Sequence, residues 1–409
     1  MRVLIVAPSD VRQVTGGLEL HVRDLAAALE ERGIETLVAC PARGFARSSR
    51  TLLLPASFAL LPAAYRRGAP LHPPWADPVF ALALARLVRR WQPEVVHSHG
   101  NAFHSVRLAL PTGGPGWLHT LHDYGLLCPK ATLRHMPDGH VCSTALAPGC
   151  IPCYVAEAGT TPAAIGRGIT LTAGSAARHL GRRLPDRFVA VSRYVKAAHE
   201  RHLPESRGRT EVVYNWPTTE SDGPLAPLPP LPERFALFVG AASPHKGFPF
   251  LLRLWREIDL DLPLVAFVTG SRVEIERILA SAESRVYMHV NVDHRVVLLA
   301  WRKALMGLVP SLWPETFCLV ALEAMTAGCP VIASSLGGLP EVVGDAGLLL
   351  PPGDMTAWRE EVLRLASDDA LRAALGEQGR ERARELFSRE RGVTALVRLY
   401  REVAGRSMP

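Results

Sequence analysis

The sequence contains no hydrophobic run long enough to cross a membrane, which takes about 20 consecutive apolar residues. Its most apolar stretch, Thr51 to Tyr65, is shorter and is interrupted by Pro55 and Pro62, so we expect a packed loop there. The opening residues, Met1–Ala7, have the pattern of a buried strand, and they lack the apolar core and the cleavage site of a signal peptide. These absences favour a cytoplasmic protein.

Lysine is scarce, because arginine supplies all but four of the 46 basic residues and so carries the net charge of +7. This charge is diffuse and comes with neither an RNA-binding motif nor a zinc-finger helix, so we expect no nucleic-acid partner. A positive balance suits phosphate-bearing ligands or the anionic inner face of a membrane, and a peripheral membrane contact stays open. The preference for arginine is equally typical of a GC-rich genome.

What the chain does contain is an alternation of strand and helix patterns in two halves, with 48% hydrophobic residues over 409 positions. The strands expected in the first half are Arg2–Ala7, Ile34–Ala39, Glu94–His97, Trp117–Leu121 and Phe188–Ser192. Those expected in the second half are Phe235–Gly240, Leu264–Thr269, Val286–His289, Leu305–Val309 and Pro330–Ala333. The expected helices are Leu18–Arg32, Tyr194–His202, Phe248–Ile258 and a charged tail from Arg380 to Arg406. This order predicts two α/β domains, each with a doubly wound parallel sheet.

The composition also indicates where the domains end. We expect an N-terminal domain over residues 1–215 and a proline-rich linker over 216–233. A second domain is expected over 234–385. The remaining helix, over 386–409, has enough apolar residues to pack back on the N-terminal domain.

Two glutamates, Glu315 and Glu323, lie at the beginning and within a predicted short helix. This helix covers Phe317 to Thr326, follows Pro314 and ends before Gly328. Backbone N–H groups at the start of a helix attract anions and polar oxygens. Among apolar neighbours, the Glu323 carboxylate would be costly unless it accepted hydrogen bonds from a hydroxyl-rich partner such as a sugar or a ribose. The alternative is an amphipathic helix with one solvated glutamate.

Four motifs, in order along the chain, resemble those of the retaining glycosyltransferases of family 4. They are Gly16-Gly-Leu-Glu-Leu-His-Val-Arg-Asp-Leu25, Gly240-Ala-Ala-Ser-Pro-His-Lys-Gly247, Pro310 through Glu323, and Gly337-Gly-Leu-Pro-Glu-Val-Val343 with Gly347 to Asp354. The resemblance runs from Met1 to about Glu385. It implies the GT-B fold, in which two Rossmann-like, doubly wound domains face each other across a cleft. One glycine pair would be weak support, since turns use glycine in any protein. The order of four motifs is specific.

The resemblance implies roles for residues of the second domain. Lys246, in the loop that starts at Gly240, would bind the diphosphate and neutralise the charge that develops on it as it leaves. The family usually has an arginine after this first glycine, and here the position is Ala241. We therefore expect that another arginine reaches in or that turnover is weaker. Glu315 would contact the transferred sugar, and Glu323 would hold the ribose hydroxyls.

The resemblance also implies a role for the backbone of this domain. The amides of Phe317, Cys318 and Leu319 would hold sugar hydroxyls or phosphate oxygens. The family needs no metal bound by an Asp-x-Asp motif, and Asp259-Leu-Asp261 reads as a turn before a strand. No catalytic metal is therefore expected.

In the first domain, the resemblance implies that Gly16 and Gly17 form the loop that approaches the diphosphate. His122 has the position of the family's active-site histidine, where it would hydrogen-bond the transferred sugar or help to manage the proton of the acceptor. His97 and His99, at the end of a predicted strand, are expected to be structural.

Four of the seven cysteines fall within a predicted loop over 125–155, in the spacing C-x13-C-x7-C-x2-C. They are Cys128, Cys142, Cys150 and Cys153. Four thiolates with one close pair match the ligands of a structural zinc site or an iron–sulfur cluster. Disulfides and unligated thiols are the alternatives. A loop fixed by a metal there would shape the acceptor pocket.

The function implied by the resemblance is transfer of a sugar from a nucleotide-diphosphate donor to a hydroxyl, with retention of configuration. The acceptor would be a glycan, as in polysaccharide biosynthesis, a lipid-linked saccharide or a small natural product. A nucleotide-sugar epimerase and a non-catalytic nucleotide-sugar binder on the same scaffold are the alternatives. Release of free nucleotide together with product would separate the transferase from both.

Overall fold

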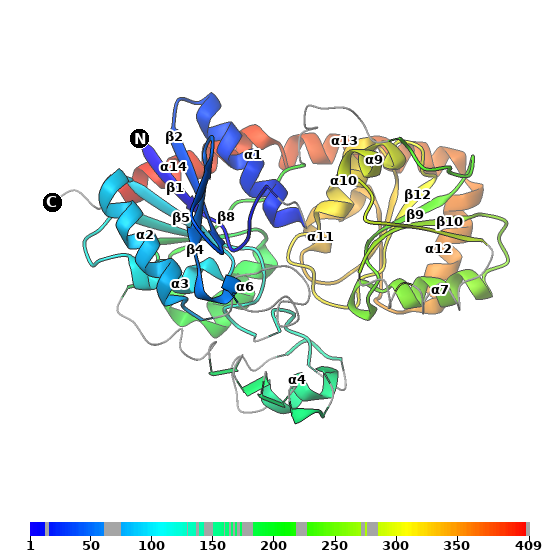
Figure 1. Ribbon diagram of the computed structural model, residues 1–409. Coiled ribbons are helices and arrows are strands. Elements are labelled where there is room, and N and C mark those ends of the chain that lie inside the picture. The colour runs from blue at the N-terminus through cyan, green and yellow to red at the C-terminus, as the bar shows by residue number, and fades with distance from the viewer. Residues whose placement is uncertain are drawn as a thin grey trace. The chain divides into compact units, whose positions relative to one another are not determined.

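The chain divides into two compact units (Figure 1). Unit 1 comprises Met1–Tyr214 and Glu390–Pro409, and unit 2 comprises Asn215–Arg389. The computed structural model describes residues 1–12, 16–60, 75–128, 130–135, 139–142, 150–158, 160–162, 165–166, 168–169, 172–173, 183–217, 227–270, 275 and 285–405. Among these residues, no helix combines the length and the apolar character that crossing a membrane requires.

Unit 1 is built on an eight-stranded sheet in the order β3-β4-β2-β1-β5-β6-β7-β8. Its strands are β1 (Arg2–Val6), β2 (Glu35–Ala42), β3 (Ala46–Ser48), β4 (Thr51–Pro55), β5 (Val95–His99), β6 (Gly116–Leu121), β7 (Arg187–Ala190) and β8 (Thr210–Val212). All pairings are parallel except that of the edge strand β3 with β4. Most residues of β1, β5 and β6 are buried, as expected of central strands covered on both faces.

Helices cover both faces of this sheet (Figure 1). The helices of unit 1 are α1 (Gly17–Glu31), η1 (Ser57–Leu60), α2 (Pro78–Trp91), α3 (Ala102–Ala109), α4 (Cys150–Ala158), α6 (Arg193–His202), η4 (Pro204–Ser206) and α14 (Arg389–Gly405). α1 and α14 lie on one side, and α2, α3 and α6 on the other, because parallel strands are joined by right-handed crossovers. Asp77 caps α2 by accepting a hydrogen bond from the Phe80 amide at 2.9 Å, and Pro78 occupies the first helical position.

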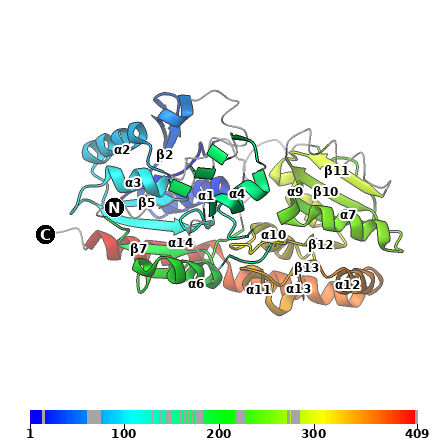
Figure 2. The same ribbon diagram turned by 90° about the horizontal axis from the view of Figure 1, so that it is seen from below.

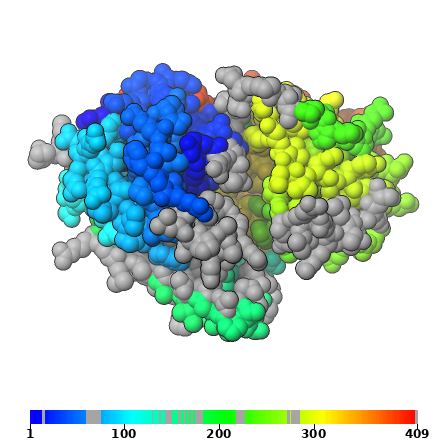
Figure 3. Space-filling model, viewed as in Figure 1, coloured from blue at the N-terminus to red at the C-terminus, as the bar shows by residue number. Residues whose placement is uncertain are grey.

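α14 returns the end of the chain to unit 1, where it runs beside the sheet in both ribbon views (Figure 2). A Cβ on Gly116 of β6 would lie 2.6 Å from the Val403 carbonyl oxygen, so glycine permits this close packing. Arg187 and Arg398 form ion pairs with Glu402 and Glu211, which join α14 to β7 and β8. On the face shown in Figure 3, the surface of unit 1 is formed by the earlier segments coloured blue and cyan, and α14 is hardly visible.

Unit 2 contains a six-stranded, fully parallel sheet in the order β11-β10-β9-β12-β13-β14. Its strands are β9 (Ala236–Ala241), β10 (Leu264–Thr269), β11 (Val286–Val290), β12 (Met306–Val309), β13 (Val331–Ser334) and β14 (Leu348–Leu350). Its helices are η5 (Pro244–Lys246), α7 (Phe248–Glu257), α9 (His294–Trp301), α10 (Leu319–Ala327), α11 (Leu339–Val343), η6 (Gly344–Ala346), α12 (Met355–Ser367) and α13 (Asp369–Leu386). α7 and α12 pack on one side of the sheet and α9 and α10 on the other (Figure 1).

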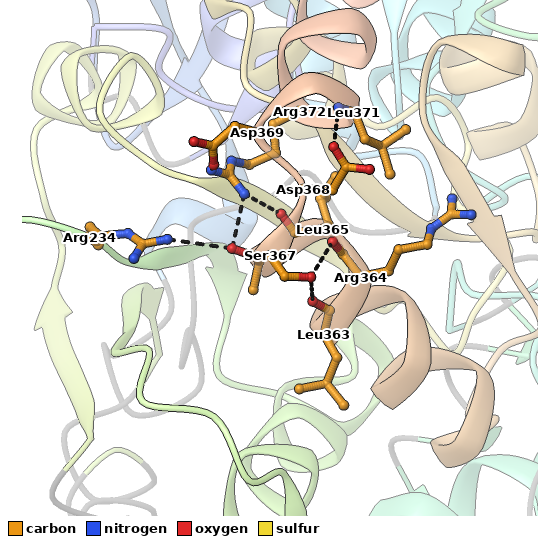
Figure 4. Close-up of polar contacts among 10 residues, drawn as sticks. Arg234, Leu363, Arg364, Leu365, Ser367, Asp368, Asp369, Leu371 and Arg372 are labelled. Carbon is orange, nitrogen blue, oxygen red and sulfur yellow. Dashed lines mark hydrogen bonds and ion pairs between the residues drawn. The ribbon is translucent and has the colours of Figure 1, made fainter.

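A capped corner joins α12 to α13 (Figure 4). The Asp368 amide donates to the Arg364 carbonyl at the end of α12, and its carboxylate accepts from the Leu371 amide of α13 at 2.8 Å. Arg372 donates from Nη1 to the Leu365 carbonyl at 2.6 Å, which satisfies one of the free carbonyls at the end of α12. The corner therefore fixes the direction in which α13 leaves.

α13 packs closely on α10, the helix that carries Glu323. A Cβ on Gly376 would lie 2.4 Å from the Gly328 carbonyl oxygen, and a Cβ on Gly379 would lie 3.4 Å from Met325. Two glycines on one face of α13 thus let the two helices approach. α13 therefore packs against the C-terminal part of α10.

The expected strands and the three internal helices are present, with ends shifted by a few residues. Two predictions were wrong. Thr51–Pro55 forms β4 rather than a loop, since it pairs with β2 across Val38–Ala42; the segment from residue 61 to Tyr65 lies outside the described residues. The tail is not one helix, because α13 ends at Leu386 and α14 starts at Arg389.

Candidate functional site

Predicted site residues of unit 2 gather at the carboxyl ends of its strands. Lys246 follows β9, Glu315 follows β12 and Gly337 follows β13. Lys246 Nζ lies 2.7 Å from Glu315 Oε1, which also accepts a hydrogen bond of 2.5 Å from Ser311 Oγ. The structure therefore brings the predicted phosphate cation and the predicted sugar-contacting carboxylate into one ion pair. This is the edge of the sheet at which ligands bind in open α/β folds.

This pair is charged. Burial acts to raise the pKa of Glu315, but the Lys246 charge and hydrogen bonds from Lys246 and Ser311 outweigh it, and the pKa is lowered. Burial acts to lower the pKa of Lys246, but the charge of Glu315 outweighs it, and the pKa is raised. Glu315 is 4% exposed, so the site holds a desolvated ion pair at neutral pH. A diphosphate arriving there would compete with Glu315 for the lysine.

Glycines allow the loops around this pair to touch. A Cβ on Gly247 would lie 1.9 Å from the Pro310 carbonyl oxygen, and Gly247 has the left-handed φ of 74°. A Cβ on Gly337, whose φ is 67°, would lie 2.4 Å from the Glu315 nitrogen. The Gly338 amide donates to the Glu315 carbonyl at 2.6 Å. The backbone of Glu315 is thus held from both sides by turns that no larger residue could replace without displacement.

Trp313 lies beside the cation. Lys246 Nζ is 5.1 Å from the centre of the Trp313 ring, within the range of a cation–π contact. His245 meets the same ring edge to face at 5.6 Å between centroids. Sequence reasoning missed this contact, since tryptophan before proline in a loop is compatible with simple packing.

The start of α10 differs from the prediction. The helix begins at Leu319, two residues later than expected, because Cys318 has a left-handed φ of 83°. Such a conformation is strained for a residue with a side chain and costs about 1–3 kcal/mol. Phe317 is 1% exposed and packs against Phe387. Anion binding by the Phe317, Cys318 and Leu319 amides stays a prediction.

Glu323 has a partner that sequence reasoning missed. Its Oε1 lies 2.8 Å from Nε2 of His294, the first residue of α9, and Glu323 is 5% exposed. Asp293 caps α9 by accepting from the Arg295 amide at 2.9 Å, which fixes the start of the helix. Burial acts to lower the pKa of His294, but the hydrogen bond and charge of Glu323 outweigh it and raise the pKa. The solvated-glutamate alternative is therefore wrong.

The glycines expected to approach the diphosphate lie at element ends. Gly240 is the penultimate residue of β9, and Ala241 is the last. In unit 1, Gly16 precedes α1 with extended backbone and Gly17 is its first residue. Glu19, in the first turn of α1, is buried and accepts a hydrogen bond from Ser9 Oγ. The roles of these glycines stay predictions.

His122 follows β6, is partly buried and contacts buried imidazoles of unit 1. Its Nε2 lies 2.8 Å from His99 Nδ1, and the two rings stack with centroids 5.1 Å apart. His21 of α1 meets His122 edge to face at 5.3 Å. The two histidines expected to be structural thus differ. His97 hydrogen-bonds Tyr400, which is not a predicted site residue, whereas His99 contacts the predicted site residue His122.

The cysteine segment is described only in part. Cys128 and Cys142 lie in loops, and Cys150 and Cys153 lie in α4. Within the described residues, which include these four, no group of three or more His, Cys, Asp or Glu side chains is arranged to hold a metal ion. A zinc or iron–sulfur site at these four cysteines stays a prediction.

Comparison with known proteins identifies the family and the fold. The model of Glycosyltransferase Family 4 matches residues 15–221, and that of Glycosyl transferases group 1 matches residues 226–382. The uncharacterized glycosyltransferase MJ1178 of Methanocaldococcus jannaschii is 30% identical over 224 residues, which are 54% of this chain and 60% of that protein. The D-inositol 3-phosphate glycosyltransferase of Corynebacterium efficiens is 32% identical over 42% of this chain and 44% of that protein. The chain thus spans about half the length of the curated relatives it matches.

Solved structures share the fold over nearly the whole chain. Sucrose-phosphate synthase from Thermosynechococcus elongatus has a TM-score of 0.71 at 21% identity, with 99% of each chain covered. Anabaena Alr3699/HepE in complex with UDP-glucose has a TM-score of 0.62 at 15% identity, again with 99% of each chain covered. The two parallel-sheet α/β units are those of the GT-B fold. Since the family model covers half of the sequence, the chain belongs to glycosyltransferase family 4, a family of transferase enzymes.

Proposed function

We propose that the protein is a retaining glycosyltransferase that moves a sugar from a nucleotide-diphosphate donor to a hydroxyl of a glycan, a lipid-linked saccharide or a small natural product. The observation that carries this proposal is the buried pair of Lys246 and Glu315, which lies with Glu323 and the start of α10 at the carboxyl ends of the unit 2 strands. The complex of Anabaena Alr3699/HepE with UDP-glucose supports a nucleotide-sugar donor.

Lys246 would act on the leaving diphosphate. Breaking the bond from sugar to phosphate leaves negative charge on the phosphate oxygens, and a fixed ammonium group stabilises that charge more in the transition state than in the ground state. Glu315 holds Lys246 in place before the donor binds. The diphosphate would share this lysine with Glu315.

Glu323 would hold the donor through its ribose. One carboxylate oxygen accepts from His294, which fixes the plane of the carboxylate. The other oxygen could then accept hydrogen bonds from the ribose hydroxyls, which would offset the cost of burying the charge. His122 in unit 1 would contact the transferred sugar.

The test is release of free nucleoside diphosphate in step with formation of a glycosylated acceptor. The purified protein would be incubated with UDP-, GDP-, ADP- and TDP-sugars and a panel of acceptors, after thermal-shift screening has selected the nucleotide. At about 100 times its dissociation constant, a ligand adds roughly 2.7 kcal/mol of stability. Glu323→Ala should abolish the shift, whereas Glu360→Ala, which removes an exposed glutamate of α12, should preserve it.

Each outcome decides the proposal. Nucleotide release coupled to product, with the anomeric configuration of the donor kept, supports a retaining transferase. Inversion would refute the retaining mechanism only. A changed sugar without nucleotide release would indicate an epimerase, and binding without any turnover would indicate a nucleotide-sugar binder.

A further inference from the structure

The carboxyl end of β5 in unit 1 carries two histidines on one face of the sheet, beside Thr120 of β6. His97 pairs in register with Leu118, and His99 pairs with Thr120, so the side chains of His97, His99 and Thr120 point to the same face. This is the face on which α14 packs, since Tyr400 of that helix reaches His97. All three β-strand side chains are at most 2% exposed.

His97 is fully satisfied there. Its Nδ1 lies 2.7 Å from the Tyr400 hydroxyl and its Nε2 lies 2.7 Å from Thr120 Oγ1. A hydroxyl can donate or accept, so either neutral tautomer of His97 keeps both hydrogen bonds. His97 is therefore a buried core residue with both ring nitrogens hydrogen-bonded.

His99 is different. Its Nδ1 lies 2.8 Å from Nε2 of His122, but its own Nε2 is buried and has no hydrogen-bond partner among the described residues. Buried polar atoms without partners are rare in folded proteins, and each calls for an explanation. His122 is only partly buried, and its Nδ1 remains for a ligand.

Both imidazoles are neutral at neutral pH. Burial lowers the pKa of His99 and that of His122 well below the ordinary value, and the neighbouring histidines, His21 and His97 among them, lower both further. A neutral imidazole carries one proton, on one of its two nitrogens. The contact between His99 and His122 therefore contains one N–H donor and one bare nitrogen.

Only two arrangements satisfy this contact. If His122 donated from Nε2, the proton of His99 would sit on its buried Nε2 as an N–H group without an acceptor. If His99 donates from Nδ1 to His122 Nε2, its own Nε2 carries no proton and is a buried acceptor without a donor. Unmatched buried acceptors are tolerated more often than unmatched buried N–H groups. The second arrangement is favoured.

We propose that His99 is a positioning residue that donates from Nδ1 to Nε2 of His122 and thereby fixes His122 as the tautomer with its proton on Nδ1. The assignment of the tautomer is independent of the proposed function, but the role of His122 toward the substrate rests on it. His122 would meet the substrate as a hydrogen-bond donor, because the nitrogen that could accept a proton is already occupied by His99. It would hydrogen-bond an oxygen of the transferred sugar and would not act as the base for the acceptor hydroxyl.

The direct test needs no substrate. Long-range ¹H–¹⁵N correlation spectra of the full chain, labelled with ¹⁵N-histidine, report which ring nitrogen carries the proton, and His122→Gln assigns the signals. We expect His122 to show a protonated Nδ1 and a bare Nε2 at neutral pH. His99→Asn, whose amide can still donate, should keep this pattern, whereas His99→Leu should shift it toward protonated Nε2. His119→Asn, on the opposite face of β6, should leave it unchanged.

Turnover provides a second test once a donor is known. An asparagine amide nitrogen lies close to the place of Nδ1, and a glutamine amide nitrogen close to that of Nε2. His122→Asn should therefore retain about tenfold more kcat/KM than His122→Gln, the factor that one hydrogen bond commonly contributes. His99→Leu should lose kcat, and His99→Asn should recover it.

Three results would overturn the proposal. They are a protonated Nε2 on His122 in the wild-type protein, a doubly protonated His122 at neutral pH, or a His99→Leu variant whose His122 signals do not move. Because these spectra are recorded without substrate, they stand even if no glycosyl transfer is found. A failed transfer assay would count against the proposed function and leave the assignment of the tautomer untouched.

Discussion

The two units surround their candidate site residues with different ionisable groups. In unit 2 the buried carboxylates of Glu315 and Glu323 each pair with a partly exposed basic residue, Lys246 and His294. In unit 1 the buried His99 and the partly buried His122 stay neutral, because burial lowers the pKa of each imidazole. The charged state suits a ligand with a diphosphate, since fixed ions in a dry site act strongly on developing charge. The neutral state suits hydrogen bonds to an uncharged sugar, which need a defined donor.

The largest effect is expected from removing the cation of unit 2. Lys246→Met should lower kcat by about 10² to 10³, because a preorganised group that stabilises developing charge contributes that much. It should also destabilise unit 2 by about 3 kcal/mol, since it leaves Glu315 buried and unpaired. The measurements are steady-state kinetics and denaturant unfolding followed by hydrogen exchange, which reports on each unit separately.

The double variant separates these two effects. Adding Glu315→Gln to Lys246→Met removes the uncompensated charge, so most of the stability should return while activity stays low. If stability and activity returned together, Lys246 would matter only for packing. If neither stability nor activity fell in Lys246→Met, the ion pair of Lys246 and Glu315 would contribute to neither.

The sequence predicted the parts of this picture that depend on local pattern. Buried apolar runs indicated five strands of each sheet but not β3, β8 or β14, and glycine-rich turns indicated where Lys246 and Glu315 would lie. It missed β4, because Pro55 and Pro62 argue against a strand, whereas Pro55 is only the last residue of β4. It placed the start of α10 too early, because good helix formers conceal the left-handed turn at Cys318.

Contacts between distant residues could not be predicted. The partner of Glu323 is 29 positions away, and nothing local distinguishes His294 from a solvated residue at the start of a helix. His99 lies 23 positions before His122, and its strand pattern gave only a structural interpretation. Both contacts depend on which strands are neighbours in the sheet and on their register, which a single sequence does not specify.

A smaller loss of stability is expected as the pH falls, and it should be larger in unit 1 than in unit 2. Burial lowers the pKa of His119 to about 3 and that of His21 to about 4. The unfolded chain binds protons at these residues below about pH 6.5 while the folded unit does not. Their contribution to stability is therefore present above pH 6.5 and is lost as the pH falls, by about 1.4 kcal/mol per pH unit for each histidine.

Hydrogen exchange at matched intrinsic rates should show this loss. Between pH 7.5 and pH 5.5, peptides of unit 1 should lose more protection than those of unit 2, because burial lowers the pKa of several histidines in unit 1 and only that of His289 among the shifts described in unit 2, where Glu315 has a lowered pKa and stays ionised. His119→Asn should reduce the pH dependence of the stability of unit 1 by about 1.4 kcal/mol per pH unit, the contribution of one histidine. Equal losses in both units would contradict the division into neutral and charged interiors.

The smallest effect concerns the second charged pair of unit 2. Because Glu323 raises the pKa of His294, the stability that the pair contributes is fully present below about pH 6.5 and is lost as the pH rises through the raised value. His294→Gln should therefore destabilise unit 2 by about 1 kcal/mol at pH 6 and by less at pH 9. His289 of β11 offers a control of opposite sign, since burial lowers its pKa and its contribution is lost as the pH falls. Denaturant unfolding of His294→Gln and His289→Gln across this range should give differences from the wild type that change with pH in opposite directions. If both changed alike, the contact at 2.8 Å would not carry charge, and Glu323 would be buried with a neutral partner.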